Sequence, residues 1–389
     1  MSLGVYIAGS GKDAGKTTLC LGLSGALNSM VPGGVSFFKP LGQKITVVDG
    51  ESVGQDSWFI SRALGLSGIQ GESTPLLASR GAAERFITTG EPRGIQAAVK
   101  RAFREHCRES GLVLVEGTGH PGVGSVFDLG NAKVASLLGI PVILVLDGGV
   151  GSTIDSFCLC QALFKAHGVP ILGVVINRVK PEKYDPVASV LGIWFAGAGV
   201  PVFGVLPFEE RIARPSIASI TKEIGALPLF AFDGMVCSDG SGFLTAFDSS
   251  DEVLSRMGRE EGRALLVSRS RPEVLDAVIV SALSGGPRPS AVVVCGGEPD
   301  QRRQAACVAS GIPLFHTAVT LQGSSDRLSG HVFKIEPDED QKIASILAMV
   351  ERNVDSRRIL DVLRGDSGSR GRVSQKGVIG FLKRLFHRG

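Results

Sequence analysis

The sequence contains few of the features that mark metal-binding, secreted or membrane-spanning chains. Its seven cysteines include no C-x-x-C pair and no other run with metal-ligand spacing, which favours reduced, buried thiols. No uninterrupted apolar run reaches the ~18 residues that a transmembrane helix needs. Ser10, Lys12 and Asp13 interrupt the apolar start, so we expect no signal peptide. These absences favour a cytoplasmic protein.

The net charge is small but unevenly distributed. Lysine and arginine exceed aspartate and glutamate by three, yet residues 367–389 hold six basic residues and no acidic one. The first 366 residues therefore carry a net charge of −3. Nucleic-acid binding needs a basic surface, which a mildly acidic body does not offer. We expect no nucleic-acid partner.

The order of apolar and amphipathic segments predicts the fold class. A chain of 389 residues has room for two or three domains, and it contains no tandem repeat. Six near-continuous apolar runs in the first 225 or so residues predict buried parallel strands: GVYIAG, GVSFFKP, LVLVEG, PVILVLD, ILGVVIN and PVFGVLP. The amphipathic stretches between them predict helices, including Thr17–Asn28, Gln96–Ser110, Asn131–Leu138 and Ser152–His167. This alternation predicts a doubly wound α/β domain with a mostly parallel sheet.

A second, shorter α/β alternation follows a seam near Gly225–Gly234. Its predicted strands are RALLVSR, SAVVVCGG and IPLFHT, and its predicted helices lie near 272–283, 301–309 and 338–353. The later stretch RGDSGSRGRVSQKG is nearly free of apolar residues and reads as a flexible basic linker. We therefore predict four parts, namely 1–226, 227–353, the linker 354–376 and a terminal helix over 377–389.

The stretch VYIAGSGKDAGKTT reads as a strand, a tight glycine-rich turn and a helix. Its end matches a G-x-x-x-x-G-K-[ST] loop, although a serine stands where the first glycine would be. In such a loop, backbone N–H groups surround phosphates, the lysine reaches the β- and γ-phosphates, and the hydroxyl binds Mg²⁺. A glycine-rich turn that binds nothing is the alternative. The predicted nucleotide-binding residues are Ser10, Gly11, Asp13, Ala14, Gly15, Lys16, Thr17 and Thr18.

Charged residues near the ends of predicted strands supply the rest of a phosphate site. Glu116 directly follows a buried strand and Asp56 lies in VGQDSW, so both are candidate Mg²⁺ ligands with Thr17. Lys39 ends the second strand, where a cation lies in the same crevice and neutralises a transferred phosphoryl group. The alternatives are a solvated loop aspartate for Asp56 and a surface lysine for Lys39.

Two further segments contain candidate contacts for the adenine base and for an acceptor substrate. Asn177 ends the fifth strand with an amide that can pair with an adenine edge, and Pro207 in GVLPF follows the sixth strand beside it. His120 and Asp128 flank the glycine-rich PGVGSVFD. These two residues either contact an acceptor substrate or stabilise their loop.

The motifs AGSGKDAGKTT, FFKPLG, QDSW, VEGTGHPG, INRV and GVLPF occur in the order seen in dethiobiotin synthetase-like P-loop proteins, which about the first 215 residues resemble. The most similar variant is the domain at the N-terminus of some long phosphotransacetylases. The resemblance implies ATP and Mg²⁺ as ligands. It implies that Lys39 contacts the reacting phosphoryl group, that the two acids hold the metal, and that Asn177 reads adenine.

Two departures separate this chain from a true dethiobiotin synthetase. The loop reads S-G-K-D-A in place of T-D-T-x-V, so Lys12 stands where the synthetase has a hydroxyl residue near the reaction centre. After the K-P pair, a Ser-Gly step is replaced by Gly42, Gln43 and Lys44. Lys12 also resembles the extra lysine of partition-type ATPases, although Lys12 lies one position later in the loop than that lysine does. The candidate catalytic residues are Lys12, Lys16 and Lys39, with the substrate chemistry left open.

Residues 227 to about 350 resemble a divergent DRTGG-type domain through SRSRPE, VVVCGGEP and GIPLFHTAVT. Two parts of that motif are altered, because Ser268–Arg271 replaces G-D-R and Cys295 replaces a threonine. In relatives this domain accompanies the same P-loop domain, and the resemblance implies a regulatory role. Gly296 and Gly297 either admit a small anion to their amides or form a tight turn in a scaffold.

The terminal segment 377–389 predicts a short basic amphipathic helix. GFLKRLF resembles the C-terminal membrane-targeting helix of the Min-system ATPase that positions the bacterial division site. Such a helix suits an anionic membrane surface, where each basic residue contributes about 1 kcal/mol. Docking on the protein's own body or on a partner is the alternative. The apolar face comprises Val378, Phe381, Leu382, Leu385 and Phe386.

These observations favour an ATP-binding and hydrolysing switch in which the nucleotide controls homodimerisation or binding of a protein partner. The tail would hold it peripherally at the inner face of the membrane. The alternative is an ATP-dependent ligase of the dethiobiotin synthetase type, which activates a carboxylate or carbamate as a phosphoric anhydride. A third reading is a sensor that binds ATP in one domain and a metabolite in the other. We expect no acyl transfer, because the chain shows no phosphotransacetylase catalytic domain.

Overall fold

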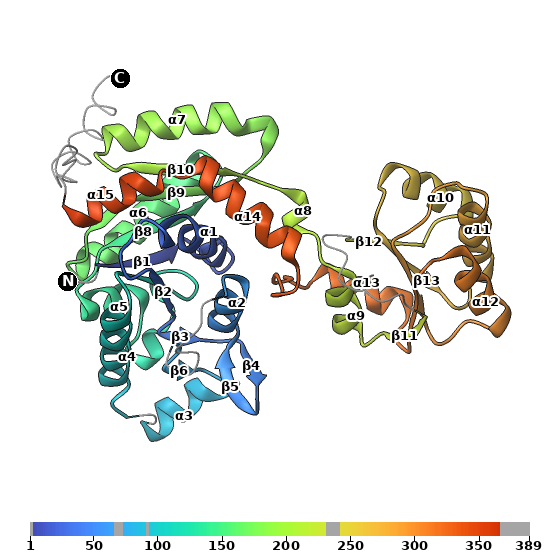
Figure 1. Ribbon diagram of the computed structural model, residues 1–389, viewed down its shortest axis with the longest axis horizontal. Coiled ribbons are helices and arrows are strands. Elements are labelled where there is room, and N and C mark those ends of the chain that lie inside the picture. The colour runs from blue at the N-terminus through green and yellow to red at the C-terminus, as the bar shows by residue number, and fades with distance from the viewer. Residues whose placement is uncertain (1–2, 66–72, 91–92, 231–241, 366–389) are drawn as a thin grey trace. The chain divides into compact units, whose positions relative to one another are not determined.

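The computed structural model describes residues 3–65, 73–90, 93–230 and 242–365 (Figure 1). Contacts divide the chain into two compact units. The first unit comprises residues up to Phe208 and those from Ser345 onward, and the second unit comprises Glu209–Ala344.

The first unit is built on a six-stranded parallel sheet in the order β10-β9-β8-β1-β7-β2. Every residue of β7 and all but the last of β8 are buried, which explains why these strands appear in the sequence as unbroken apolar runs. The predicted parallel sheet is confirmed. Its strands are β1 (Leu3–Gly9), β2 (Val35–Phe38), β7 (Leu112–Glu116), β8 (Val142–Asp147), β9 (Ile171–Val179) and β10 (Val202–Pro207).

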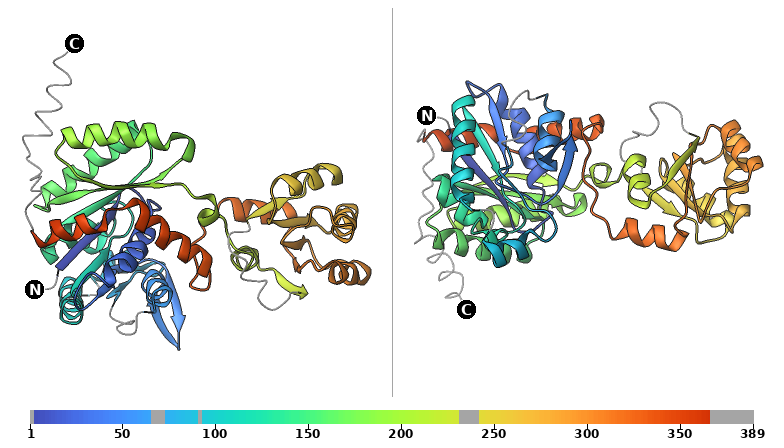
Figure 2. Two further views of the ribbon diagram at one scale, coloured as in Figure 1. Left: turned by 45° about the horizontal axis from the view of Figure 1, so that its top comes forward. Right: turned by 90° about the horizontal axis from the view of Figure 1, so that it is seen from below.

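Helices cover both faces of this sheet (Figures 1 and 2). Side chains from four helices form one continuous core on the first face. These are α4 (Ile95–Glu109), α5 (Asn131–Leu138), α6 (Gly151–Ala166) and α7 (Tyr184–Gly197). On the other face, α1 (Lys16–Asn28) lies beside two helices from the end of the described chain, α14 (Asp340–Asn353) and α15 (Ser356–Arg364). The sheet is therefore doubly wound, as the sequence predicts.

Helix α1 approaches α14 closely because α1 has glycine at the contact. A Cβ on Gly22 would lie 2.3 Å from Cβ of Val350, and one on Gly25 would lie 2.7 Å from Leu347. The helix that follows the glycine-rich loop is thus fixed against a segment more than 300 residues away in the sequence.

Several small elements surround the sheet's carboxyl edge and were not predicted. Strand β3 (Leu41–Gly42) pairs with β6 (Leu76–Leu77), while β4 (Ile45–Val48) and β5 (Glu51–Gly54) form an antiparallel hairpin. The remaining elements are α2 (Gln55–Ala63), α3 (Ala82–Thr89) and the 3₁₀ turns η1 (Ser125–Phe127) and η2 (Pro181–Lys183). The four short strands with α2 and α3 bring residues between β2 and α4 to the same edge as the loop after β1.

The second unit has a five-stranded sheet in the order β11-β15-β14-β13-β12, parallel except for the edge strand β11. Two buried clusters lie on its two faces. One holds residues of α10, α11 and α12, and the other holds residues of α9 and α13. The strands are β11 (Leu227–Phe230), β12 (Phe243–Thr245), β13 (Ala264–Ser268), β14 (Ala291–Cys295) and β15 (Leu314–Thr317). The helices are α8 (Glu210–Ala213), α9 (Ile217–Ile224), α10 (Ser250–Arg259), α11 (Pro272–Leu283), α12 (Gln301–Ser310) and α13 (Leu321–Ser329).

The unit boundaries differ from those that the sequence predicts. The predicted seam at 226/227 falls inside the second unit, because three isoleucines of α9 are buried against Leu266 and Val293 of its sheet. The predicted linker at 354–376 begins with α15, whose Ile359 and Leu360 are buried. Both segments were misassigned because their apolar residues become interpretable only once their packing partners are known.

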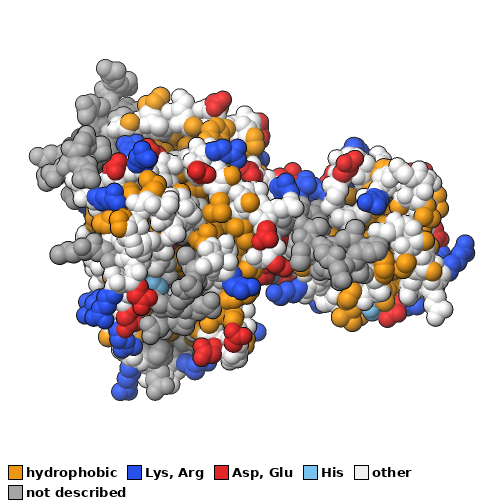
Figure 3. Space-filling model, viewed as in Figure 1, with side chains coloured by type: hydrophobic (Ala, Val, Ile, Leu, Met, Phe, Trp, Pro, Cys, Tyr) orange, Lys and Arg blue, Asp and Glu red, His pale blue; other side chains and the backbone are white. Residues whose placement is uncertain are grey.

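No helix among the described residues is long and apolar enough to cross a membrane. The predicted amphipathic helix at 377–389 and most of the predicted linker lie outside the described residues. On the face in Figure 3, basic and acidic side chains are intermixed.

His106 on α4 gives the first unit a specific acid sensitivity. The ring is 2% exposed, lies 5.2 Å from the ring of Phe38, and has no hydrogen-bond partner on either nitrogen among the described residues. Burial lowers the pKa of His106 from 6.5 to about 4, although nearby Glu105 acts weakly in the opposite direction. The unfolded chain therefore binds the proton between pH 6.5 and 4 while the folded chain does not.

We expect the free energy of unfolding of the first unit to fall as pH drops from 6.5 towards 4, by up to roughly 3 kcal/mol from this group. His106→Leu should flatten that dependence. Trp58 and Trp194, the two tryptophans of the chain, both lie in the first unit, so urea unfolding followed by their fluorescence reports on it. An equally steep pH dependence in wild type and variant would contradict this assignment.

Candidate functional site

The candidate site lies at the carboxyl end of the central strand β1. After Gly9 the chain turns sharply, the Ser10 N–H donates to the Val145 carbonyl (3.0 Å), and α1 begins at Lys16. Gly15 precedes the helix with φ +93°, a left-handed conformation that favours glycine. The open loop and the helix N-terminus together present backbone N–H groups at one edge of the sheet, which is the arrangement that phosphate binding needs.

Lys16 lies at the centre of this loop. Its side chain is buried, and Nζ donates to the carbonyls of Gly11 (2.8 Å) and Lys12 (3.1 Å). Burial lowers the pKa of Lys16, and the charge of Glu116 opposes that shift. The loop is thus wrapped around an ammonium group that it partly desolvates.

Lys39, Asp56 and Glu116 meet beside the loop. Lys39 follows β2 and Glu116 ends β7, two neighbouring parallel strands, and Asp56 lies in the first turn of α2. Lys39 Nζ lies 2.5 Å from both Asp56 Oδ2 and Glu116 Oε1. Thr17 Oγ1, at the start of α1, donates to the same Glu116 oxygen at 3.0 Å. The structure therefore brings together the four side chains for which the sequence predicted metal and phosphoryl contacts.

All three charged members of this cluster are buried, with exposures of 5% for Lys39, 8% for Asp56 and 1% for Glu116. Burial alone would lower the pKa of Lys39, but the adjacent carboxylates of Glu116 and Asp56 raise it above its ordinary value. The lysine is therefore charged at every physiological pH.

The cluster also contains an unsatisfied acceptor. Glu116 Oε2 is buried and has no hydrogen-bond partner among the described residues. A buried carboxylate oxygen without a partner costs free energy unless a cation or water contacts it. Mg²⁺ prefers oxygen ligands and keeps several waters, so Thr17, Asp56 and Glu116 fit it as a partial ligand set. No group of three His, Cys, Asp or Glu side chains with metal-binding geometry occurs among the described residues. Phosphate and water oxygens would complete the shell, because Mg²⁺ retains waters and binds substrate phosphates.

Asn177 makes a contact with the loop that the sequence did not predict. Its Nδ2 donates to the Ala14 carbonyl (2.9 Å), and a Cβ on Gly15 would lie 1.9 Å from that nitrogen. The Asn177 amide therefore stabilises the conformation of the loop through the Ala14 carbonyl. Pro207 ends β10 in register with Val179, just beyond Asn177 on the adjoining strand.

The other residues of the loop differ in their exposure to solvent. Lys12 and Asp13 are exposed, and Lys12 contributes only its carbonyl to the contacts of Lys16. Ala14 is buried, while Ser10, Gly11 and Thr18 are partly exposed. The Lys12 side chain therefore does not join the buried cluster.

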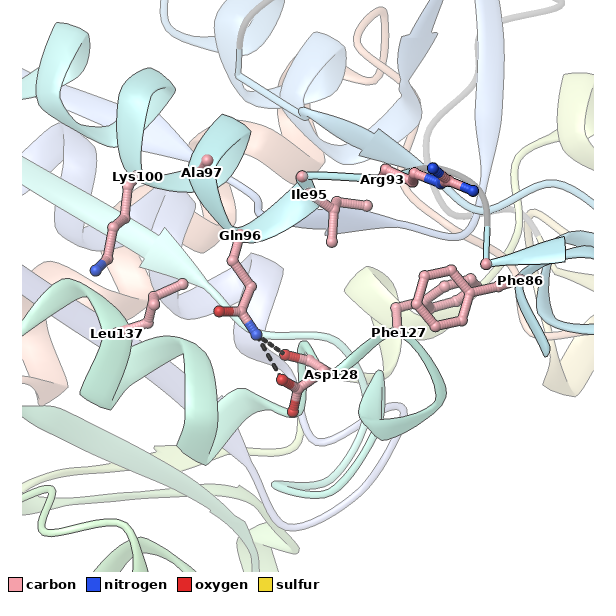
Figure 4. A pocket seen from close by; sticks show the side chains of 11 residues that line it. Phe86, Arg93, Ile95, Gln96, Ala97, Lys100, Phe127, Asp128 and Leu137 are labelled. Carbon is pink, nitrogen blue, oxygen red and sulfur yellow. Dashed lines mark hydrogen bonds between the residues drawn. The ribbon is translucent and has the colours of Figure 1, made fainter.

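His120 and Asp128 are not brought together. His120 is exposed and its Nδ1 accepts from the Gly122 N–H (3.2 Å). Asp128 accepts two hydrogen bonds from Gln96 Nε2, at 2.5 Å to Oδ2 and 3.3 Å to its own carbonyl. Asp128 lines an open hollow of about 600 Å³ between α3, α4, η1 and α5, which His120 does not line (Figure 4).

Asn131 is a site-supporting residue that the sequence analysis missed. It begins α5, is buried, and bonds with the Tyr6 hydroxyl (2.9 Å), both backbone groups of Thr118 and the His120 carbonyl (2.7 Å). These bonds fix the loop that follows Glu116. The available signal was an asparagine at the first position of a predicted helix, directly after a glycine-rich stretch.

In the second unit, Gly296 and Gly297 do not present free amides. Both N–H groups donate to the Thr317 carbonyl at 2.9 Å, so the anion-binding alternative for these amides does not match the structure. Both residues have positive φ, and Cβ on Gly297 would lie 3.4 Å from Arg269. The tight-turn alternative matches the structure.

Comparisons with known proteins agree with this geometry. A family model described as an AAA domain matches residues 3–216. The chain belongs to this family. ATP-dependent dethiobiotin synthetase of Saccharopolyspora erythraea is 30% identical over 228 residues, which cover 58% of this chain and 95% of that protein. The first part of the chain is therefore a P-loop ATPase domain of dethiobiotin synthetase type.

Other relatives are longer than this chain. Phosphate acetyltransferase of Nitratidesulfovibrio vulgaris is 27% identical over 389 residues, covering 92% of this chain and 51% of that protein. Cobyric acid synthase of Pelotomaculum thermopropionicum is 28% identical over 195 residues, covering 45% of this chain and 37% of that protein. The chain thus spans about half or less of the length of these two relatives. The phosphate acetyltransferase match necessarily extends into the second unit.

Proposed function

We propose that the first unit binds Mg-ATP at the loop of residues 10–18 and hydrolyses it as a nucleotide switch. The observation that carries this proposal is the buried cluster in which Lys39, Asp56 and Glu116 meet beside the loop hydroxyl of Thr17. A glycine-rich turn without a ligand has no need to bury two carboxylates and two lysines at its mouth, because burying charges is costly.

The residues of the loop and of the cluster have distinct proposed roles. Lys16 exchanges its contacts with loop carbonyls for oxygens of the β- and γ-phosphates. Thr17, Asp56 and Glu116 would hold Mg²⁺, which when bound offsets phosphate charge. Lys39 neutralises charge on the transferred phosphoryl group. The exposed Lys12 is a candidate for a contact on the acceptor side.

The adenine is proposed to lie at the ends of β9 and β10, near Asn177 and Pro207. Because the Asn177 amide already donates to the loop, its contribution includes holding the loop in the binding conformation. The second unit is proposed to act as a DRTGG-type regulatory domain. Its inclusion in the phosphate acetyltransferase match supports a shared two-domain arrangement.

The switch is proposed to act as a homodimer at a membrane surface or on a protein partner. The support is the sequence of 377–389, with its apolar face and basic residues. One short helix gives weak, reversible membrane binding, and two in a dimer bind far more strongly. Nucleotide-dependent dimerisation would therefore control membrane residence.

The membrane proposal is tested by co-sedimentation with anionic liposomes. The full chain should co-sediment in the presence of Mg-ATP, whereas a chain ending at Gln375 should stay in the supernatant. ADP production measured in parallel should rise with liposomes only in the full chain. Equal sedimentation of the two chains would exclude the tail as a membrane anchor.

A ligase is the second candidate, and the similarity to dethiobiotin synthetase favours it. Here ATP would activate a carboxylate or carbamate, with Lys16 and Lys39 stabilising the developing charge. The hollow beside Asp128 offers volume for a small acceptor. ADP production that is negligible alone but appears with a diamine and bicarbonate would favour the ligase over the switch.

A further inference from the structure

Lys39 occupies the position between two carboxylates that a divalent cation would share. Its ammonium lies 2.5 Å from an oxygen of each acid, and all three side chains are at least nine-tenths buried. A divalent cation that shares Asp56 Oδ2 and Glu116 Oε1 must displace the ammonium, because Glu116 Oε2, which has no partner among the described residues, offers the cation only a single oxygen. The lysine is thus a built-in substitute for the metal.

Charge balance indicates when the exchange occurs. Two lysines, Lys16 and Lys39, lie at the site with two carboxylates, Asp56 and Glu116, so the formal charges of these four side chains balance without nucleotide. Mg²⁺ alone would add two positive charges to a buried site, which is unfavourable. ATP brings four negative charges, which both lysines can contact. The metal is therefore accommodated only when phosphates are present to receive the displaced ammonium.

We propose that Lys39 excludes divalent metal from the nucleotide-free site and is transferred from the carboxylates to the phosphates when nucleotide arrives. The proposal rests on the proposed function, because it takes the loop as the ATP site. It makes metal and nucleotide binding strongly coupled, and by reciprocity each raises the affinity for the other by the same factor. The nucleotide-free protein would then bind divalent metal only weakly.

Mn²⁺ binding followed by electron paramagnetic resonance tests this in the full chain, with Mn²⁺ as the probe. Without nucleotide, wild type should bind Mn²⁺ weakly. With a non-hydrolysable ATP analogue present, the protein should bind Mn²⁺ at least about tenfold more tightly than the analogue does in the absence of protein. Lys39→Met should bind Mn²⁺ at least about tenfold more tightly than wild type without nucleotide. Adding Glu116→Gln to Lys39→Met should abolish that gain.

Matched controls make the result specific. Lys165→Met removes an exposed lysine of α6 and should leave Mn²⁺ binding unchanged. Lys39→Gln replaces Lys39→Met if the latter fails to fold, and the wild-type coupling measurement needs no variant. Equal Mn²⁺ affinity of wild type with and without the analogue, or no gain in either Lys39 variant, would overturn the proposal. Binding of a fluorescent ATP analogue in EDTA separates the outcomes, since its absence would instead contradict the proposed function.

Discussion

Gly15→Ala is expected to reduce nucleotide affinity at least about a hundredfold. Gly15 has φ +93°, and a left-handed conformation costs a residue with a Cβ roughly 1–2 kcal/mol. The new methyl group would also lie 1.9 Å from Asn177 Nδ2 and 3.1 Å from its Cγ. Relieving this overlap requires either movement of the loop or rotation of the Asn177 side chain with loss of its hydrogen bond to the Ala14 carbonyl, and either change disturbs the amides that would contact phosphate.

The controls for Gly15→Ala come from the same fold. Gly151→Ala adds a methyl group at the start of α6, where no atom lies within 4 Å, and should bind nucleotide like wild type. Asn177→Ala removes the overlapping amide, so Gly15→Ala should cost less in that background than in wild type. The measurement is the affinity for a fluorescent ATP analogue of wild type, the three single variants and the double variant. Wild-type affinity in a folded Gly15→Ala variant would mean that nucleotide binds elsewhere.

Glu116→Gln is expected to lower Mg²⁺-dependent ADP production at least about a hundredfold while nucleotide binding in EDTA is retained. The substitution keeps the shape of the side chain but removes the charge that faces Thr17 and Lys39. A neutral amide binds Mg²⁺ weakly and leaves Lys39 paired with Asp56 alone.

The measurement is ADP production against Mg²⁺ concentration for wild type, Glu116→Gln and the control Glu109→Gln, an exposed glutamate at the end of α4. Glu109→Gln should have the same turnover rate and Mg²⁺ dependence as wild type. A turnover rate and Mg²⁺ dependence of Glu116→Gln equal to those of wild type would remove Glu116 from the site.

The sequence predicted those parts of the fold that have a strong local signal. All six strands of the first sheet were found, because each is nearly all apolar, and β7 and β8 above all are buried on both faces. The convergence of Lys39 and Glu116 also followed from sequence, since the carboxyl ends of parallel strands share one edge.

What the sequence did not predict depends on contacts between distant segments. Helix α15 was taken for a linker because it is short and largely polar, and its Ile359 and Leu360 acquire meaning only against the sheet and α1. The direction of the Asn177 amide depends on where the Ala14 carbonyl lies, which spacing does not encode. The pairing of Lys39 with both carboxylates likewise needs the position of Asp56, which the unpredicted helix α2 provides.

The central claim is that the loop and cluster of the first unit form a Mg-ATP site. Isothermal titration of a non-hydrolysable ATP analogue into the full chain, once with Mg²⁺ and once with EDTA, tests it most directly. We expect saturable binding of one nucleotide per chain that is markedly tighter with Mg²⁺. Absence of binding in both titrations by the folded protein would contradict it.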